Sequence, residues 1–274
     1  MHQSRSVAAL LLAGSLVSAA AAAQTVTNQF EPTVGQPGKD VVWVPSPQVT
    51  VERMLDVAKI TPQDFVMDLG SGDGRNIIAA ARRGARALGV EYNPDMVTLS
   101  RRNAAEAGVG DRAQFVEGDM FEADISKASA LILFLLPDNL VRLRDKFLNM
   151  RPGSRIVVNT FGIAEWDPDH REQIENCTSW CSVMLYIVPA KVAGTWQLAD
   201  GELTLSQTYQ MLSGSLTRGG TATPISEGRV RGNDVEFTVG GVRYTGTLAS
   251  NGQLSGTDAS GARWSARQAA AAAR

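Results

Sequence analysis

V-M-D-L-G-S-G-D-G-R-N-I-I, residues 66–78, is the stretch that decides the fold. The apolar residues 65–67 predict a short buried strand, and residues 76–81 predict the helix behind it. Between them, Gly70, Gly72 and Gly74 stand at alternate positions. Because glycine lacks a side chain, this spacing indicates a loop whose backbone approaches another group closely.

Strands alternate with helices along the region that follows. Apolar runs predict strands at 86–90, 113–117, 131–136 and 155–158. Capping residues and helical spacing predict helices at 75–83, 93–108 and 137–150, after a first helix that starts near Ser46-Pro47. This alternation indicates an α/β domain at residues 43–190, with a Rossmann-like, mostly parallel sheet and helices on both faces.

The pattern changes after residue 190. Short β segments separated by glycines recur through residues 191–267, with hairpin turns at 232–234 and 250–252. They predict a C-terminal antiparallel β meander or a small barrel. Residues 268–274, rich in alanine, are expected to form a frayed tail.

The N-terminus has the features of an export signal. A short charged start, an apolar run from Val7 to Val17 and an Ala-x-Ala ending predict a signal peptide at residues 1–23. A linker is expected at 24–42, rich in Thr, Gly, Pro and Gln. We therefore expect an exported, periplasmic protein, or a cytosolic one where the leader does not function.

Composition limits the partners. The net charge of -2 and the lack of a basic run do not favour nucleic acid. After the leader, no apolar stretch approaches the roughly 20 residues of a membrane span, so no stable membrane insertion is expected once the signal is cleaved.

Cys177 and Cys181 are the two cysteines. Export would permit a disulfide between them, and two free thiols are the alternative. No metal site is predicted, because a zinc site needs more ligands than two cysteines and His170 is the only histidine near them. His170 itself is expected to be a surface loop residue. Trp166, Trp180 and Trp196 are expected to be packing residues.

Acidic residues follow three predicted strands. Asp68, Glu91 and Asp119 each stand at a strand end, where ligands of parallel α/β sheets bind. A dinucleotide loop, G-x-G-x-x-G, would place its third glycine where this chain has Arg75. Two carboxylates, Asp68 and Asp73, would repel a pyrophosphate. They suit a ligand that carries an amine, a sulfonium and sugar hydroxyls.

S-adenosylmethionine is such a ligand, and the motifs D-L-G-S-G-D-G-R, W-V-P-S-P and L-F-L-L-P resemble those of class I S-adenosylmethionine-dependent methyltransferases. The resemblance covers roughly residues 43–170 and is to the branch of FAM173-type and DOT1-like lysine methyltransferases and their bacterial relatives. It implies a methyltransferase that acts on an amine of a protein, such as lysine, or on a small molecule.

The resemblance also implies roles for cofactor-binding residues. The backbone of Gly70, Ser71, Gly72 and Gly74 would pass under the methionine part and the ribose. Asp68 and Asp73 would meet the ammonium group, Glu91 the ribose hydroxyls and Asp119 the adenine amino group. The adenine ring would pack on Met120 and Phe121, and the segment with Trp43 and Pro45 would cover the cofactor, although the family typically has tyrosine there. The alternatives are a solvated strand end for Glu91, a turn residue for Asp119 and a core residue for Trp43.

The acceptor channel is expected to be lined by Phe134, Leu135, Leu136, Pro137 and Phe161. No catalytic residue is assigned. The competing hypothesis is an exported, non-catalytic binding or interaction protein that retains a nucleoside pocket. Export itself conflicts with a cofactor that is made in the cytosol, which leaves an imported cofactor, a non-functional leader or another ligand as explanations.

Overall fold

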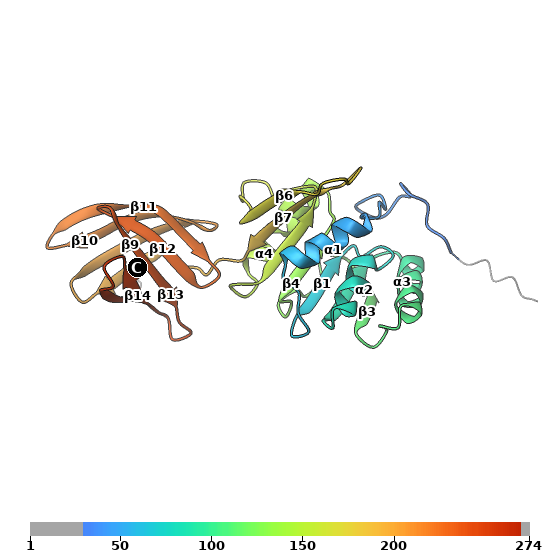
Figure 1. The fold of residues 1–274 in the computed structure, drawn as a ribbon, viewed down its shortest axis with the longest axis horizontal. Helices are drawn as coiled ribbons and strands as arrows, with labels where there is room; N and C mark the ends of the chain where they lie inside the picture. Colours follow the sequence, from blue (N-terminus) through green and yellow to red (C-terminus); the bar gives the residue numbers. More distant parts are fainter. Residues whose placement is uncertain (1–29, 270–274) are drawn as a thin grey trace, which may run out of the picture. The chain divides into compact units, whose positions relative to one another are not determined.

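The computed structural model describes residues 30–269. The predicted signal peptide, the start of the linker and the end of the tail lie outside the described residues. The α/β region contains α1 (Gln48–Val57), β1 (Phe65–Leu69), α2 (Arg75–Arg82), β2 (Arg86–Glu91), α3 (Pro94–Glu106), β3 (Ala113–Glu117), β4 (Ala130–Leu133), α4 (Pro137–Leu148), β5 (Arg155–Asn159), β6 (His170–Gln173) and β7 (Ser182–Ile187) (Figure 1).

These strands form one seven-stranded sheet in the order β3-β2-β1-β4-β5-β7-β6. The first five are parallel, and β7 runs antiparallel to both β5 and β6. The chain order reverses between β1 and β4, so the loops after these two strands leave a crevice at the carboxyl edge of the sheet. The mostly parallel Rossmann-like sheet is confirmed.

Apolar side chains alternate between the two faces of this sheet, as strand geometry requires. Val66, Ile132 and Val157 pack in one cluster with residues of α1, α2 and α3. A second cluster contains residues of α4 together with Met67, Leu131 and Val158. These three are the immediate sequence neighbours of the strand residues in the first cluster. Helices therefore lie on both faces of the sheet.

Capping residues explain where two helices begin. The Asn93 side chain accepts hydrogen bonds from the backbone N–H groups of Asp95 and Met96, and Pro94 occupies the first turn of α3. Pro137 likewise occupies the first turn of α4. The strand predicted at 131–136 ends earlier, at Leu133, because this proline and its preceding residue already belong to the helix start.

The C-terminal region is a closed barrel of β8 (Gly194–Leu198), β9 (Gly201–Thr208), β10 (Met211–Arg218), β11 (Thr221–Arg231), β12 (Asp234–Val239), β13 (Val242–Leu248), β14 (Gln253–Asp258) and β15 (Arg263–Gln268). Each strand pairs with the next, and β15 pairs with β8 to close the ring. Every strand contributes to one buried cluster, whose largest members are Trp196, Trp264 and Tyr244. The interior is therefore packed with side chains, and the expected meander closes into a barrel.

Two expectations about single residues hold only in part. His170 is exposed, as expected, but it lies on β6 and not in a loop, with its ring nitrogen Nε2 3.0 Å from Glu172 Oε2. Trp180 is 37% exposed, whereas the other two tryptophans named with it, Trp166 and Trp196, are each 1% exposed. In the described part of the chain, no helix combines the length and apolarity needed to cross a membrane.

A buried carboxylate joins the amino ends of three parallel strands. Asp64 Oδ1, just before β1, accepts a hydrogen bond of 2.7 Å from Ser129 Oγ and forms a salt bridge with Arg155, the first residue of β5. Its Oδ2 accepts 2.8 Å from the Thr61 backbone N–H. Burial opposes the charge, but these hydrogen bonds outweigh it and lower the pKa of Asp64.

We predict that Asp64→Asn lowers the free energy of unfolding by about 1–3 kcal/mol at neutral pH, because Arg155 loses its buried partner. Since the pKa is lowered in the folded state, the carboxylate stabilises the fold above its unfolded pKa. That contribution is lost as the pH falls through the folded pKa. Urea unfolding followed by circular dichroism should therefore show a difference that shrinks toward about pH 3. Asp111→Asn, at an exposed position, is the control, and an equal loss in both variants would contradict the assignment.

Candidate active site

The glycine loop after β1 follows a path that side chains would obstruct. Gly70, Gly72 and Gly74 all have positive φ, at 75°, 54° and 84°. A Cβ on Gly72 would lie 2.8 Å from Trp43 Nε1, and one on Gly74 would lie 2.7 Å from the Phe115 ring. The Gly70 and Ser71 N–H groups both donate to the Val90 carbonyl, at 2.8 and 3.1 Å. The loop is thus pinned to the end of β2 and pressed against Trp43.

Glu91, the last residue of β2, holds the same loop through its side chain. Its Oε2 accepts 2.9 Å from the Gly72 N–H, and its Oε1 accepts 2.9 Å from the Asn93 N–H. The carboxylate therefore lies at the crossing of the loop and the strand end. Both of its oxygens keep a further lone pair for a ligand.

Asp68 is the buried carboxylate of the site, with 3% of its surface exposed. Its Oδ2 accepts 3.0 Å from the neutral amide of Asn76. Burial raises the pKa of Asp68 well above its usual range, and the carboxylates of Glu91 and Asp73 add to this rise. A cationic group bound beside Asp68 would restore its ionised form.

Asp73 is in a different electrostatic position. Arg75 pairs with both of its oxygens, with 2.9 Å from Nε to Oδ1, and also donates 2.6 Å from Nη1 to the Ser46 carbonyl. Its charge is thus already met by an arginine two residues further along the chain. Asp68 and Asp73 were both expected to meet the ammonium group of the cofactor. Among their described hydrogen bonds, Asp73 has a cationic partner, Arg75, whereas Asp68 has the neutral amide of Asn76.

Asn76 is a residue that the sequence analysis missed. It is buried in the first turn of α2, and its Oδ1 has no hydrogen-bond partner within residues 30–269. The Ser71 hydroxyl is in the same state. A polar residue at the start of the apolar run 77–81, eight positions after Asp68, was the available signal. Unpaired buried polar atoms of this kind fit a site that is completed by a ligand.

Asp119 follows β3 at the far side of the crevice. Its Oδ1 accepts 2.8 Å from the Phe121 N–H, and its Oδ2 forms a salt bridge with Lys39, whose ammonium lies 4.8 Å from the Tyr92 ring centroid. The Lys39 hydrogen bond and the Phe121 N–H lower the pKa of Asp119. The Phe121 ring is covered by the Arg142 guanidinium at 3.6 Å.

Two small cavities flank Gly70. One is lined by Asp68, Gly72, Asn76, Trp43 and Phe134, and the other by Glu91, Asp119, Met120 and Lys39. Each holds about 40 Å³, room for a few water molecules. Residues 38–46, which we name the strap, contribute to the lining of both cavities. Pro45 lies in this strap.

The expected acceptor residues separate into three groups. Phe134 lines the first cavity, and Phe161 stacks on it with ring centroids 6.3 Å apart. Leu135 is buried beneath the Gly70 backbone. Leu136 and Pro137 are exposed at the start of α4.

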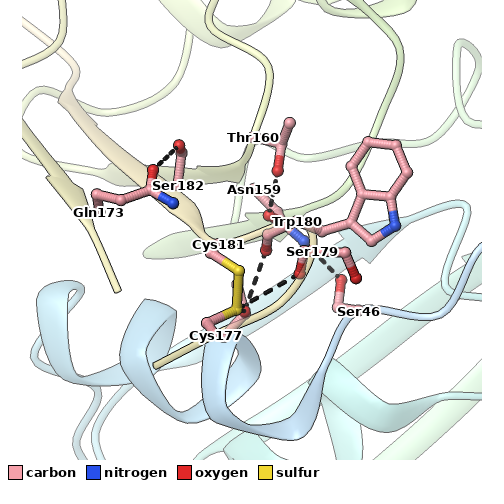
Figure 2. The surroundings of a disulfide bond; sticks show 10 residues. Ser46, Asn159, Thr160, Gln173, Cys177, Ser179, Trp180, Cys181 and Ser182 are labelled. Carbon is pink, nitrogen blue, oxygen red and sulfur yellow. Dashed lines mark hydrogen bonds between the residues drawn. A yellow bond between two sulfur atoms is a disulfide. The ribbon is translucent and has the colours of Figure 1, made fainter. Parts of the chain in front are cut away.

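Cys177 and Cys181 form a disulfide in the loop between β6 and β7 (Figure 2). Across the described residues 30–269, no group of three or more His, Cys, Asp or Glu side chains is placed to hold a metal ion. Around the glycine loop, the site presents carboxylates, amides and backbone N–H groups.

The chain is similar to several known methyltransferases. The family model for the ANTKMT methyltransferase domain matches residues 68–170. A protein-lysine N-methyltransferase of Saccharolobus islandicus is 38% identical over 151 residues, which are 54% of this chain and 94% of that protein. The mouse adenine nucleotide translocase lysine N-methyltransferase is 36% identical over 120 residues, 43% of this chain and 52% of that protein. The match thus spans about half the length of this vertebrate relative.

One similar protein has been solved with a bound form of the cofactor. It is the crystal structure of an RNA methyltransferase from Salinibacter ruber in complex with S-adenosyl-L-homocysteine, 42% identical, with a TM-score of 0.52. The match covers 54% of this chain and 96% of that one. Together with the glycine loop and the acidic strand ends, these matches place the chain in the family of S-adenosylmethionine-dependent protein-lysine methyltransferases.

Proposed function

We propose that this enzyme methylates the side-chain amine of a lysine in a protein, with S-adenosylmethionine bound across the two cavities that flank Gly70. The observation that carries the cofactor position is the buried Asp68 carboxylate, which has a neutral hydrogen-bond donor and two like charges nearby. The lysine acceptor is supported by the S. islandicus and mouse relatives, whose names specify lysine.

The residues of the first cavity fit the methionine end of the cofactor. Asp68 would take the ammonium group, and the unpaired Asn76 Oδ1 offers a second acceptor beside it. Gly70, Ser71, Gly72 and Gly74 allow close approach of the backbone. Asp73 would contribute at longer range, because Arg75 occupies its oxygens. Trp43 and Pro45 of the strap would cover this part.

The residues of the second cavity fit the nucleoside. Glu91 would accept the two ribose hydroxyls, a task that suits a carboxylate already oriented by two backbone N–H groups. Asp119 would accept the adenine amino group once Lys39 moves aside with the strap. Met120 lines this cavity and would pack on the adenine ring. Phe121 is not part of this lining, and the Arg142 guanidinium covers its ring, so Phe121 would support the adenine from behind.

S-adenosylmethionine supplies an activated methyl group on its sulfonium. The protein then has to hold the acceptor amine in line with the sulfur–methyl bond and keep water out, and such positioning can lower a barrier by about 7–11 kcal/mol in favourable cases. Phe134, which lines the first cavity, and Phe161 behind it are the aromatic candidates for this acceptor side. The amine has to be neutral to attack, so the lysine must lose its proton before transfer.

We also propose that the chain is exported and that its chemistry is confined to residues 43–190. The leader-like residues 1–23 support export, and so does the Cys177–Cys181 disulfide, since disulfides persist in oxidising compartments. The barrel, at residues 191–267, is assigned no step in the reaction because its interior is packed.

Cofactor binding should depend on pH through Asp68. Its pKa is raised in the free protein, and a bound ammonium favours the ionised form, so binding releases a proton. We expect the affinity for S-adenosylhomocysteine to rise with pH by up to about tenfold per unit until Asp68 is ionised, and to level off above that. Calorimetry at several values between about pH 5 and pH 8 measures this.

The variant Asp68→Asn should bind S-adenosylhomocysteine about 10- to 100-fold more weakly at the plateau and should lose the pH dependence, because the amide does not titrate. Asp111→Asn, which removes an exposed carboxylate, should bind like the wild type. An unchanged pH profile in Asp68→Asn would remove Asp68 from the cofactor site.

Methyl transfer can be tested directly with the full chain. Incubation with S-adenosylmethionine labelled in the methyl group, a protein extract and, separately, total RNA should label protein, and mass spectrometry should find methylated lysine. RNA is included because the Salinibacter relative bears that name. Glu91→Gln should lower the labelling by about tenfold or more, through weaker cofactor binding. Label in RNA alone would refute the lysine acceptor, and no label in either would favour a non-catalytic binding protein.

A further inference from the structure

Three aromatic side chains gather at the carboxyl edge of the sheet from three separate segments. Phe134 follows β4, Phe161 follows β5, and Trp180 immediately precedes Cys181 and β7. Because β7 is antiparallel to β5, with Val183 opposite Asn159, the start of β7 lies at the same edge as the ends of the parallel strands. The ring centroids are 6.3 Å apart for Phe134–Phe161, 5.4 Å for Phe134–Trp180 and 6.1 Å for Phe161–Trp180.

This aromatic trio adjoins the first cavity, because Phe134 belongs to the lining that also contains Asp68 and Gly72. Its rings are also accessible. Trp180 is 37% exposed and the two phenylalanines are half-buried. A tryptophan that served only as packing would be covered, as Trp166 and Trp196 are.

The backbone around Trp180 is held by three contacts, and Figure 2 shows the disulfide among them. The Trp180 carbonyl accepts a hydrogen bond of 3.1 Å from the hydroxyl of Thr50, a fully buried residue of α1. The disulfide closes the loop from Cys177 to Cys181, and the Cys181 carbonyl accepts 2.9 Å from the Ile174 N–H. Asn176 and Trp180 both have positive φ, at 56° and 57°. Such a conformation is costly for tryptophan, whereas asparagine adopts it more readily. The disulfide limits the other conformations open to the loop.

We propose that Trp180, together with Phe134 and Phe161, binds the alkylammonium group of the acceptor, and that the Cys177–Cys181 disulfide positions Trp180 for this role. The inference deepens the proposed function and rests on it. The three ring centroids lie 5.4–6.3 Å from one another, so an ammonium at the exposed Trp180 ring would also lie close to the two phenylalanine rings. Ring faces attract a cation within about 6 Å. Aromatic groups of this kind favour methylated ammonium groups, which keep their charge. The trio would therefore retain a partly methylated lysine between rounds of transfer.

The test measures binding separately from catalysis. The probe is the amide of Nα-acetyl-Nε-trimethyllysine, compared with its uncharged analogue that carries a tert-butyl group in place of trimethylammonium. Both are titrated into the full chain saturated with S-adenosylhomocysteine, with calorimetry or saturation-transfer NMR as the readout. The wild type should prefer the cation by on the order of tenfold.

Variants locate the preference. Trp180→Ala should abolish it, and Trp180→Phe should keep part of it. The double variant Cys177→Ser, Cys181→Ser should bind the cation several-fold more weakly, because the loop is no longer closed. Val49→Ala, an exposed residue of α1, is the matched control and should behave as the wild type. Affinity for S-adenosylhomocysteine should be unchanged in all four, which also shows that each variant is folded.

Equal binding of the two probes by the wild type would overturn the proposal, and so would an unchanged preference in Trp180→Ala or in Trp180→Phe. An unchanged cation affinity in the double cysteine variant would overturn the role of the disulfide. If the wild type prefers the cation but methylates no lysine, the proposed function fails while the ammonium site stands. If it methylates lysine and Trp180→Ala does so with an unchanged KM for the acceptor, only this inference fails.

Discussion

The hydrogen bond from the Gly72 N–H to the Glu91 carboxylate is the constraint on which the site depends. It joins the loop after β1 to the end of β2, two strands whose register pairs Leu69 with Val90. The loop can take this path because Gly72 carries no Cβ, and the space that a Cβ would need is occupied by Trp43 of the strap. Strand end, glycine loop and strap therefore depend on one another, and a change in any of them alters the cavity that Asp68 faces.

Much of the α/β region was predictable because its signals are local. Apolar runs, caps such as Asn93-Pro94 and glycine stops place β1 to β5 and their helices within a few residues. Polar strands were not predictable in the same way. β6 reads His-Arg-Glu-Gln, and β10 and β14 are rich in serine and glycine, so none of them shows the alternation of a half-buried strand. They are strands because neighbours pair with them, as the closure of β15 on β8 illustrates.

The candidate site divides along the same line. Asp68, Glu91 and Asp119 come near the glycine loop because carboxyl ends of parallel strands share one edge, a rule that needs no coordinates. Lys39 reaches Asp119 across 80 positions of sequence, and Thr50 reaches Trp180 across 130. No spacing or composition reports such pairs. The same holds for the exposure of Trp180, which depends on where the loop that carries it lies and not on its residue type.

The two aspartates of the D-L-G-S-G-D motif have different roles: Asp73 holds the loop in place, and Asp68 is available to a ligand. Asp73 has its cation within the chain, since Arg75 pairs with it and ties the loop to Ser46. Asp68 has an amide instead, and its burial makes the charged form unfavourable. An arginine paired with Asp68 as well would neutralise the carboxylate that a cationic ligand could otherwise meet. Because Asp68 has no arginine partner, a cationic ligand can supply the positive charge that favours its ionised form. Ligand binding would then also stabilise the loop.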